Sequence, residues 1–180
     1  MSRHIIYILI IFNIQYSIFN FQSLAQPDAK QAVAKLQTTF IYLFTKYIEW
    51  PSSYRQGDFI IGIVGDETTI FNEMKKMAQA KKAGTQNIVI KNYKTINDIS
   101  KCNMLFLPRK ESDKIGSVIN KIKGYSVLLI TEKEGMAKKG SAINFIGINI
   151  KLNFELNKGN AEKYDLQVSS SLLPLAIMVD

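Results

Sequence analysis

The stretch FIYLFTKYIEWP, from Phe40 to Pro51, ends a long amphipathic pattern and sets the point where the first helix of the fold must stop. Apolar residues recur every three or four positions through and before it, which predicts a helix with one buried stripe. Pro51 disfavours helical backbone at Trp50, the only tryptophan, so we expect the chain to turn there. The predicted stripe consists of Ala29, Ala32, Val33, Leu36, Phe40, Leu43, Phe44 and Tyr47.

Beyond the proline, short apolar runs alternate with helical patterns. Strands are expected at 58–64, 87–91, 103–107 and 125–130, and helices from Thr68 or Thr69 and at 95–100 and 112–122. After Gly140 two strands, 142–146 and 151–156, are separated by a connection short enough for a hairpin. The sequence therefore predicts an α/β fold: a Rossmann-like, largely parallel sheet with helices on both faces and a C-terminal antiparallel hairpin.

The N-terminus has the order of a secretory signal. Arg3 precedes an apolar block at 5–12, and the small residues Ser23 and Ala25 stand at the minus-three and minus-one positions before a predicted cut after Ala25. The block is too short to span a bilayer, although later apolar residues leave an uncleaved anchor as the alternative. We expect export to the periplasm, removal of residues 1–25, and a single domain at 26–180.

The charge balance is basic, with 23 Lys and Arg against 15 Asp and Glu and a net charge of +8. Paired lysines such as Lys75-Lys76 and Lys81-Lys82 either form a patch for anionic lipid or acidic protein, or are solvated helix faces. Nucleic acid is not an expected partner, because an exported chain without a recognition motif has no means of reading it.

Catalytic chemistry has few candidate residues. The only histidine, His4, lies in the signal, which excludes His-based triads and zinc sites from the mature chain. Asp66 follows a strand and is either a ligand-binding carboxylate at the carboxyl edge of the sheet or a helix cap. Glu132 and Glu134 follow the fourth strand. They either form a carboxylate pair for acid–base chemistry or calcium binding, or belong to a solvated loop. We expect no enzyme activity, no metal and no cofactor.

Cys102 is the only cysteine, so an internal disulfide is excluded. It precedes the apolar run 104–107, which favours burial of the thiol as a small hydrophobe. Pairing between two chains is the alternative in an oxidising compartment.

Six strings in register resemble the YfiR-like family of exported bacterial proteins. They are KYIEWP at 46–51, GIVGD at 62–66, CNMLFL at 102–107, GSAINF at 140–145, KLNFELN at 151–157 and SSSLLPLA at 169–176. The resemblance implies a periplasmic, repressor-type regulator that binds the periplasmic part of a membrane signalling protein, such as a diguanylate cyclase, and holds it off. Loss of such a regulator raises cyclic di-GMP and favours biofilm.

The same resemblance makes the helix exit at Tyr47, Glu49 and Trp50 a candidate partner- or ligand-binding surface, and Asp66 and Glu132 complete the candidate set. The alternative for Trp50 is a core plug or lid. A second function is a small-ligand-binding module that feeds a sensor kinase or transporter. An apolar pocket beside Trp50 would favour it, whereas an exposed apolar patch favours the repressor. Association with a second copy of the chain, as a homodimer, is a further alternative.

Overall fold

The computed structural model describes residues 25–148 and 151–180. The predicted signal peptide, apart from Ala25, lies outside the described residues, as do positions 149 and 150 between the last two long strands. Within the described part, no helix combines the length and the apolar character needed to cross a bilayer.

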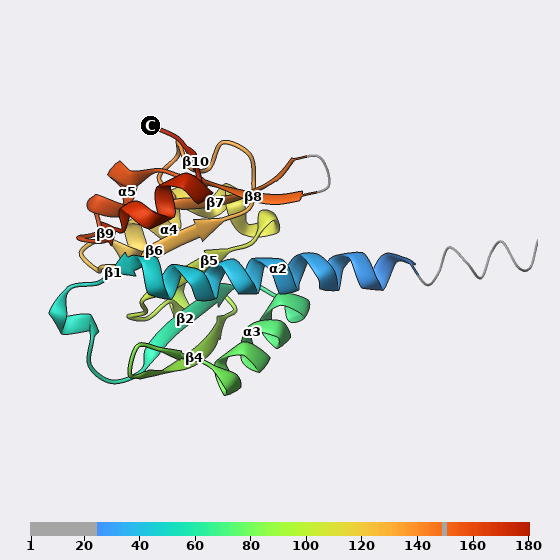
Figure 1. The fold of residues 1–180 in the computed structure, drawn as a ribbon, viewed down its shortest axis with the longest axis horizontal. Coiled ribbons are helices and arrows are strands. Elements are labelled where there is room, and N and C mark those ends of the chain that lie inside the picture. Colours follow the sequence, from blue (N-terminus) through green and yellow to red (C-terminus); the bar gives the residue numbers. More distant parts are fainter. Residues whose placement is uncertain (1–24, 149–150) are drawn as a thin grey trace, which may run out of the picture.

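Ten strands and four α-helices follow one another along these residues (Figure 1). The strands are β1 (Ile48–Glu49), β2 (Phe59–Val64), β3 (Lys82–Ala83), β4 (Gln86–Tyr93), β5 (Met104–Leu107), β6 (Leu128–Thr131), β7 (Ile143–Ile148), β8 (Lys151–Leu156), β9 (Gln167–Val168) and β10 (Ile177–Met178). The α-helices are α2 (Ala25–Tyr47), α3 (Thr68–Ala80), α4 (Ile115–Ile122) and α5 (Lys158–Glu162). Short 3-10 turns are η1 (Ser52–Tyr54), η2 (Ile96–Asp98), η3 (Arg109–Lys114) and η4 (Ser170–Leu175).

Eight of the strands form one sheet in the order β10-β8-β7-β6-β5-β2-β4-β3. Strands β4, β2, β5, β6 and β7 are parallel, which confirms the mixed α/β class with a largely parallel sheet. β7 and β8 pair antiparallel where the sequence predicts a hairpin, with Phe145 opposite Phe154. Chain order reverses between β2 and β5, so the carboxyl ends of these two strands form the switch point of a doubly wound sheet.

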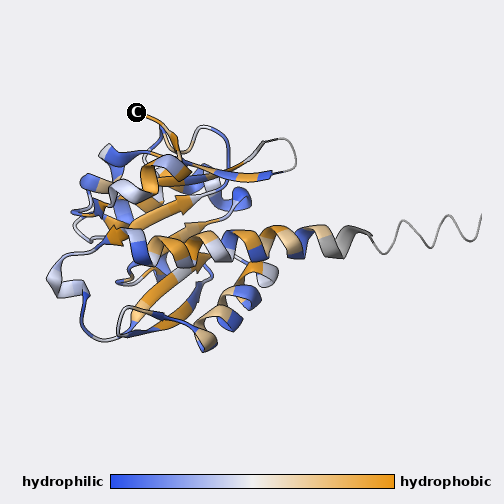
Figure 2. Cartoon of the chain, viewed as in Figure 1, coloured by the Kyte–Doolittle hydropathy of each residue, from blue (hydrophilic) through white to orange (hydrophobic). Residues whose placement is uncertain are grey.

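Two hydrophobic cores lie on the two faces of this sheet. α2, α3 and α5 contribute to one core, and α4 contributes to the other. Crossovers in opposite directions from the switch point place their helices on opposite faces, which explains the separation of α3 from α4. The central strands β5 and β6 are therefore buried at every position, and Figure 2 shows the middle of the sheet as mostly hydrophobic.

The first half of α2 buries a different face from the one predicted. Val33 and Leu36 are 45% and 49% exposed, whereas Ala34, Gln37 and Thr38 are buried. Ala29 and Ala32 are exposed as well, so the predicted burial of the first four residues of the stripe is wrong. The reason is tertiary: the Gln37 side chain reaches a carboxylate on the sheet edge, which turns its polar face inward.

The second half of α2 is held by aromatic packing. Phe44 is fully buried, and its ring centroid lies 6.5 Å from that of Phe40, 6.2 Å from that of Phe145 and 5.2 Å from that of Phe154. Ile41, outside the predicted stripe, is also fully buried. This half anchors α2 across the β7–β8 hairpin.

Candidate functional site

The five predicted site residues fall into two groups, one at each end of the parallel strands. Trp50 contacts Asn103, just before β5, and so lies at the amino ends of the parallel strands. Asp66 and Glu132 follow β2 and β6 and lie at the carboxyl ends. α2 crosses the sheet from one edge to the other (Figure 1), so the helix exit and the sheet edge are separate surfaces.

Trp50 is a core residue. Its side chain is 6% exposed, and its indole N–H donates to the Asn103 carbonyl at 3.0 Å. The ring packs edge to face on Phe59, with the two centroids 4.9 Å apart. The predicted turn at Trp50 comes later than the observed helix end: α2 ends at Tyr47, and Ile48–Glu49 pair with β9 as strand β1 before Trp50.

The neighbours of Trp50 are more accessible. Tyr47 is half-buried, and its carbonyl accepts from the Ser169 backbone N–H at 2.8 Å. Glu49 is exposed and lies 3.4 Å from the Arg55 guanidinium, itself exposed. Of the three predicted residues here, only Glu49 has a mostly exposed side chain.

A hollow of about 290 Å³ adjoins this helix exit. Its lining includes Trp50 and mixes apolar with polar side chains, among them Ile48, Phe59, Thr45, Glu49, Arg55 and Gln86. Small-molecule sites are mostly apolar and enclose about 300 to 1,000 Å³. The hollow therefore does not have the lining that the solute-binding hypothesis requires.

Asp66 does not cap α3. The helix begins at Thr68, Glu67 occupies the N-cap position, and no side chain makes a capping hydrogen bond there. The cap interpretation of Asp66 is therefore wrong, because one further residue separates it from the helix start. Its side chain is exposed at the carboxyl edge of the sheet.

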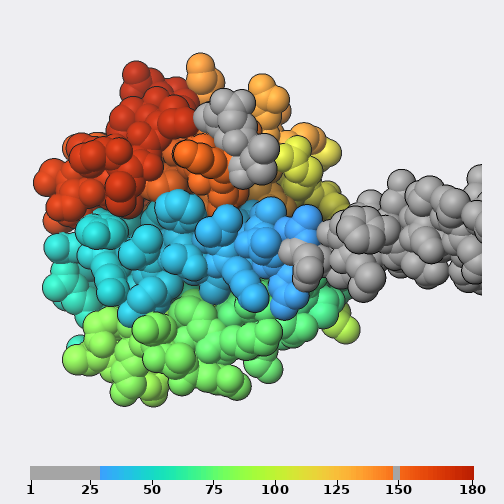
Figure 3. Space-filling model, turned by 45° about the vertical axis from the view of Figure 1, so that its right-hand side comes forward, coloured from blue at the N-terminus to red at the C-terminus, as the bar shows by residue number. Residues whose placement is uncertain are grey.

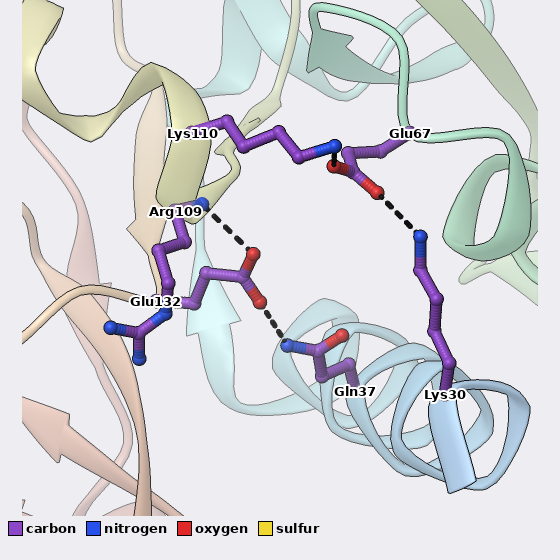
Figure 4. A network of polar contacts seen from close by, with 6 residues as sticks. All are labelled: Lys30, Gln37, Glu67, Arg109, Lys110 and Glu132. Carbon is purple, nitrogen blue, oxygen red and sulfur yellow. Dashed lines mark hydrogen bonds and ion pairs between the residues drawn. The ribbon is translucent and has the colours of Figure 1, made fainter. Parts of the chain in front are cut away.

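Glu132 joins three segments at this edge (Figure 4). One carboxylate oxygen accepts from the backbone N–H of Arg109 at 2.9 Å, and the other accepts from the side-chain amide of Gln37 at 2.6 Å. The end of β6 is thereby tied both to the start of η3 and to α2. Glu132 thus acts as a tether rather than as one of a pair of carboxylates.

Glu67 forms a second connection to the same helix. Its carboxylate lies 3.4 Å from the ammonium groups of both Lys30 in α2 and Lys110 in η3. The Glu67 side chain is 14% exposed, whereas the two lysines are 62% and 77% exposed. We call these two connections the polar clamp, which consists of Lys30, Gln37, Glu67, the Arg109 backbone, Lys110 and Glu132.

An open groove runs beside the clamp, between the first half of α2 and the β7–β8 hairpin. Its volume is about 420 Å³. We call it the α2 groove; its lining includes Val33, Leu36, Phe145, Ile146 and Leu152, with Arg109, Glu132 and Lys151. Sequence reasoning missed it because it assigned Val33 and Leu36 to the core. The polar Gln37 and Thr38 within the apolar pattern were the one available signal.

The thiol of Cys102 is unsuited to catalysis. Cys102 is 1% exposed, which confirms its predicted burial, and that burial raises its pKa to about 12. A protonated, inaccessible thiol is neither a good nucleophile nor a good metal ligand. Among the residues that the structure describes, no three His, Cys, Asp or Glu side chains gather into a metal-binding group.

Comparison with known proteins places the chain in a family. Residues 34–177, most of the 180-residue chain, match the YfiR/HmsC-like family. A search of curated proteins finds no significant match. The match runs from the first half of α2 to β10 and so covers the helix exit and every lining residue of the α2 groove except Val33. The resemblance seen in the six sequence strings is confirmed, and the chain belongs to the YfiR/HmsC-like family.

Proposed function

We propose that this chain is a periplasmic regulator that binds the periplasmic part of a membrane diguanylate cyclase and holds its output down. Membership of the YfiR/HmsC-like family supports a signalling role. The observation that carries the binding role is the exposed apolar side of α2, where Val33 and Leu36 border the α2 groove. Exposed apolar surface at a groove is typical of a protein-binding site.

The α2 groove suits protein binding better than the hollow at Trp50 suits a solute. Trp50 is buried and its N–H is already paired, so little of it is left to contact a ligand. Leu36, by contrast, has half of its surface free on a regular helix. A helix face of this kind can pack against an apolar segment of another protein.

Repression follows if the regulator binds the inactive state of the cyclase more tightly than the active state. A ligand shifts a two-state equilibrium only by the ratio of its affinities for the two states. The regulator must therefore lose affinity when the stimulus arrives, which releases the cyclase. Export with cleavage after Ala25 would deliver the chain to the compartment where this binding takes place.

The test is genetic and biochemical. Deletion of the gene should raise cellular cyclic di-GMP and biofilm, and the wild-type gene should restore both. The variant Leu36→Ser should fail to restore them, whereas Leu175→Ser, which changes a leucine of similar exposure (55%), should succeed. Mass spectrometry of the envelope fraction should find a chain beginning at Gln26. Unchanged cyclic di-GMP after deletion would refute the proposal.

A further inference from the structure

We infer that the α2 groove takes an acidic amphipathic segment of the partner protein, whose apolar side chains lie on the groove floor and whose carboxylate pairs with Arg109. The inference rests on the proposed function and names the chemistry of the segment that the regulator recognises. Three features of the described residues support it: the shape of the groove, the orientation of α2 and the distribution of charge.

The shape is that of an open trough. Its volume of about 420 Å³ lies between α2 and the β7–β8 hairpin, and two of its apolar wall residues, Val33 and Leu36, are about half-exposed. Small-molecule sites bury about 70 to 90% of their ligand, which requires walls on most sides. A trough suits a chain segment that stays attached to its own protein. Figure 3 shows α2 as a band across the surface, flanked by the C-terminal segments.

The orientation of α2 keeps the apolar side of this trough exposed. Rotation of the helix to bury Leu36 would separate Gln37 from Glu132 and Lys30 from Glu67. The observed orientation instead buries Gln37 and the Thr38 hydroxyl, which has no hydrogen-bond partner among the described residues. Burial of an unpaired hydroxyl is unfavourable. The polar clamp thus holds the helix in an orientation that favours an apolar partner over its own core.

The charge of the trough is basic. Arg109 and Lys151 contribute two positive charges and Glu132 one negative charge. Both oxygens of Glu132 already accept hydrogen bonds, and Figure 4 shows the Arg109 guanidinium turned away from that carboxylate. Neither Arg109 nor Lys151 has an ion-pair partner within the part of the chain that the structure describes. A guanidinium beside an apolar surface favours a carboxylate, which it can bind through two N–H groups.

The experiment is calorimetric titration of the full mature chain with the purified periplasmic segment of a membrane diguanylate cyclase from the same genome. Arg109→Glu and Leu36→Ser should each weaken binding by about tenfold or more. Two matched controls, Lys123→Glu and Leu175→Ser, should stay within about twofold, because their side chains do not line the groove. Melting temperatures of all four variants should match the wild type, so that weaker binding is not misfolding.

A charge swap identifies the partner carboxylate. One Asp or Glu of the cyclase segment, changed to Lys, should weaken binding to the wild type and restore binding to Arg109→Glu. Restoration requires that the two side chains meet across the interface. Binding should also weaken as salt rises from 50 to 300 mM for the wild type, and less so for Arg109→Glu.

The outcomes separate the inference from the proposed function. Failure of the wild type to bind the segment would refute the proposed function. Wild-type binding that Arg109→Glu leaves within twofold would overturn the inference alone. A homodimer in sedimentation that Leu36→Ser dissociates would assign the groove to a second copy of this chain. Stoichiometric binding of decanoate, lost in Arg109→Glu with cyclase binding unchanged, would assign it to a small carboxylate. Either of these results would overturn the inference.

Discussion

The two halves of α2 are held to the sheet by different forces. From Phe40 onward the helix is fixed by phenylalanine rings that pack against the β7–β8 hairpin. Before Phe40 it is fixed by the polar clamp, while Val33 and Leu36 face outward. The aromatic half of α2 therefore contributes mainly to stability, whereas the clamped half keeps an apolar surface exposed in a fixed orientation.

The energies of the two halves should differ accordingly. Removal of a fully buried aromatic ring costs about 3 to 5 kcal/mol, whereas an exposed ion pair contributes less than about 1 kcal/mol. The clamped half is therefore expected to open locally while the rest of the molecule stays folded. Binding surfaces are commonly drawn from such low-stability regions.

The largest effect is expected for Phe44→Ala. The ring is fully buried and contacts Phe145 and Phe154, so its loss should lower the free energy of unfolding by about 3 to 5 kcal/mol. Urea denaturation measures the change. Leu36→Ala, on the exposed side of the same helix, should change it by less than about 1 kcal/mol. Equal losses in the two variants would contradict the comparison.

Labelling of Cys102 separates local opening of α2 from global unfolding. Cys102 belongs to the core on the opposite face of the sheet, under α4, so local opening of the first half of α2 leaves its thiol buried. With its pKa raised from 9 to about 12, the thiol stays protonated in the folded protein. Thiol labelling at pH 8 should therefore follow global unfolding. A loss of about 1 kcal/mol in Gln37→Met should speed labelling by no more than about fivefold. The loss of about 3 to 5 kcal/mol in Phe44→Ala should speed it by roughly one hundred to four thousand-fold, since 1.4 kcal/mol is tenfold. Labelling of Gln37→Met as fast as that of Phe44→Ala would show that the two halves are coupled.

The same raised pKa predicts a loss of stability at high pH. The unfolded thiol ionises near pH 9 and the folded thiol near pH 12. The contribution is fully present below about pH 9 and is lost as pH rises toward 12. Cys102→Ala should remove this part of the alkaline decline in the free energy of unfolding. An identical decline in the variant would place its origin elsewhere.

Gln37→Met should loosen the first half of α2 alone. The substitution removes the hydrogen bond from the Gln37 amide to Glu132, worth about 1 kcal/mol, and keeps the side-chain length. Amide exchange should become several-fold faster at residues 30–38 and stay unchanged from Phe44 onward. Hydrogen exchange with mass spectrometry resolves the two segments. Uniform acceleration along the helix would argue against two separately held halves.

The smallest effect is expected for Glu67→Gln. Its two ion pairs, to Lys30 and Lys110, involve lysines that are mostly exposed, so their joint contribution should stay below about 1 kcal/mol and shrink with salt. Thermal melts at 50 and 500 mM NaCl measure both features. Lys158→Gln, which removes another exposed pair far from the groove, is the matched control.

Local sequence signals predict the longer elements but not the short strands and contacts that depend on long-range pairing. The run 103–107 predicts β5 closely, and Pro51 marks the region where α2 gives way to β1. Strands β1, β3, β9 and β10 were not predicted, because each has two residues and exists only through pairing with another segment. The cap interpretation of Asp66 starts α3 one residue too early. The observed N-cap is Glu67, and the sequence around it offers several residues that suit a helix start.

The candidate site shows the same division. Periodicity predicts that α2 is a helix. It does not determine whether the face with Val33 and Leu36 or the face with Ala34 packs on the sheet. That choice depends on Glu132, nearly a hundred residues later in the sequence, which binds Gln37. The α2 groove therefore needs the tertiary structure, whereas Pro51 alone predicts the helix exit to within three residues of its observed end at Tyr47.

The most direct test of the account compares hydrogen exchange of the mature chain with and without the periplasmic cyclase segment. The account predicts slower exchange at residues 30–38 in the complex, with residues 49–55 unchanged, because it proposes the clamped half of α2 as the binding surface. Protection confined to residues 49–55 would contradict it. That result would return the partner surface to the helix exit at Glu49 and Trp50.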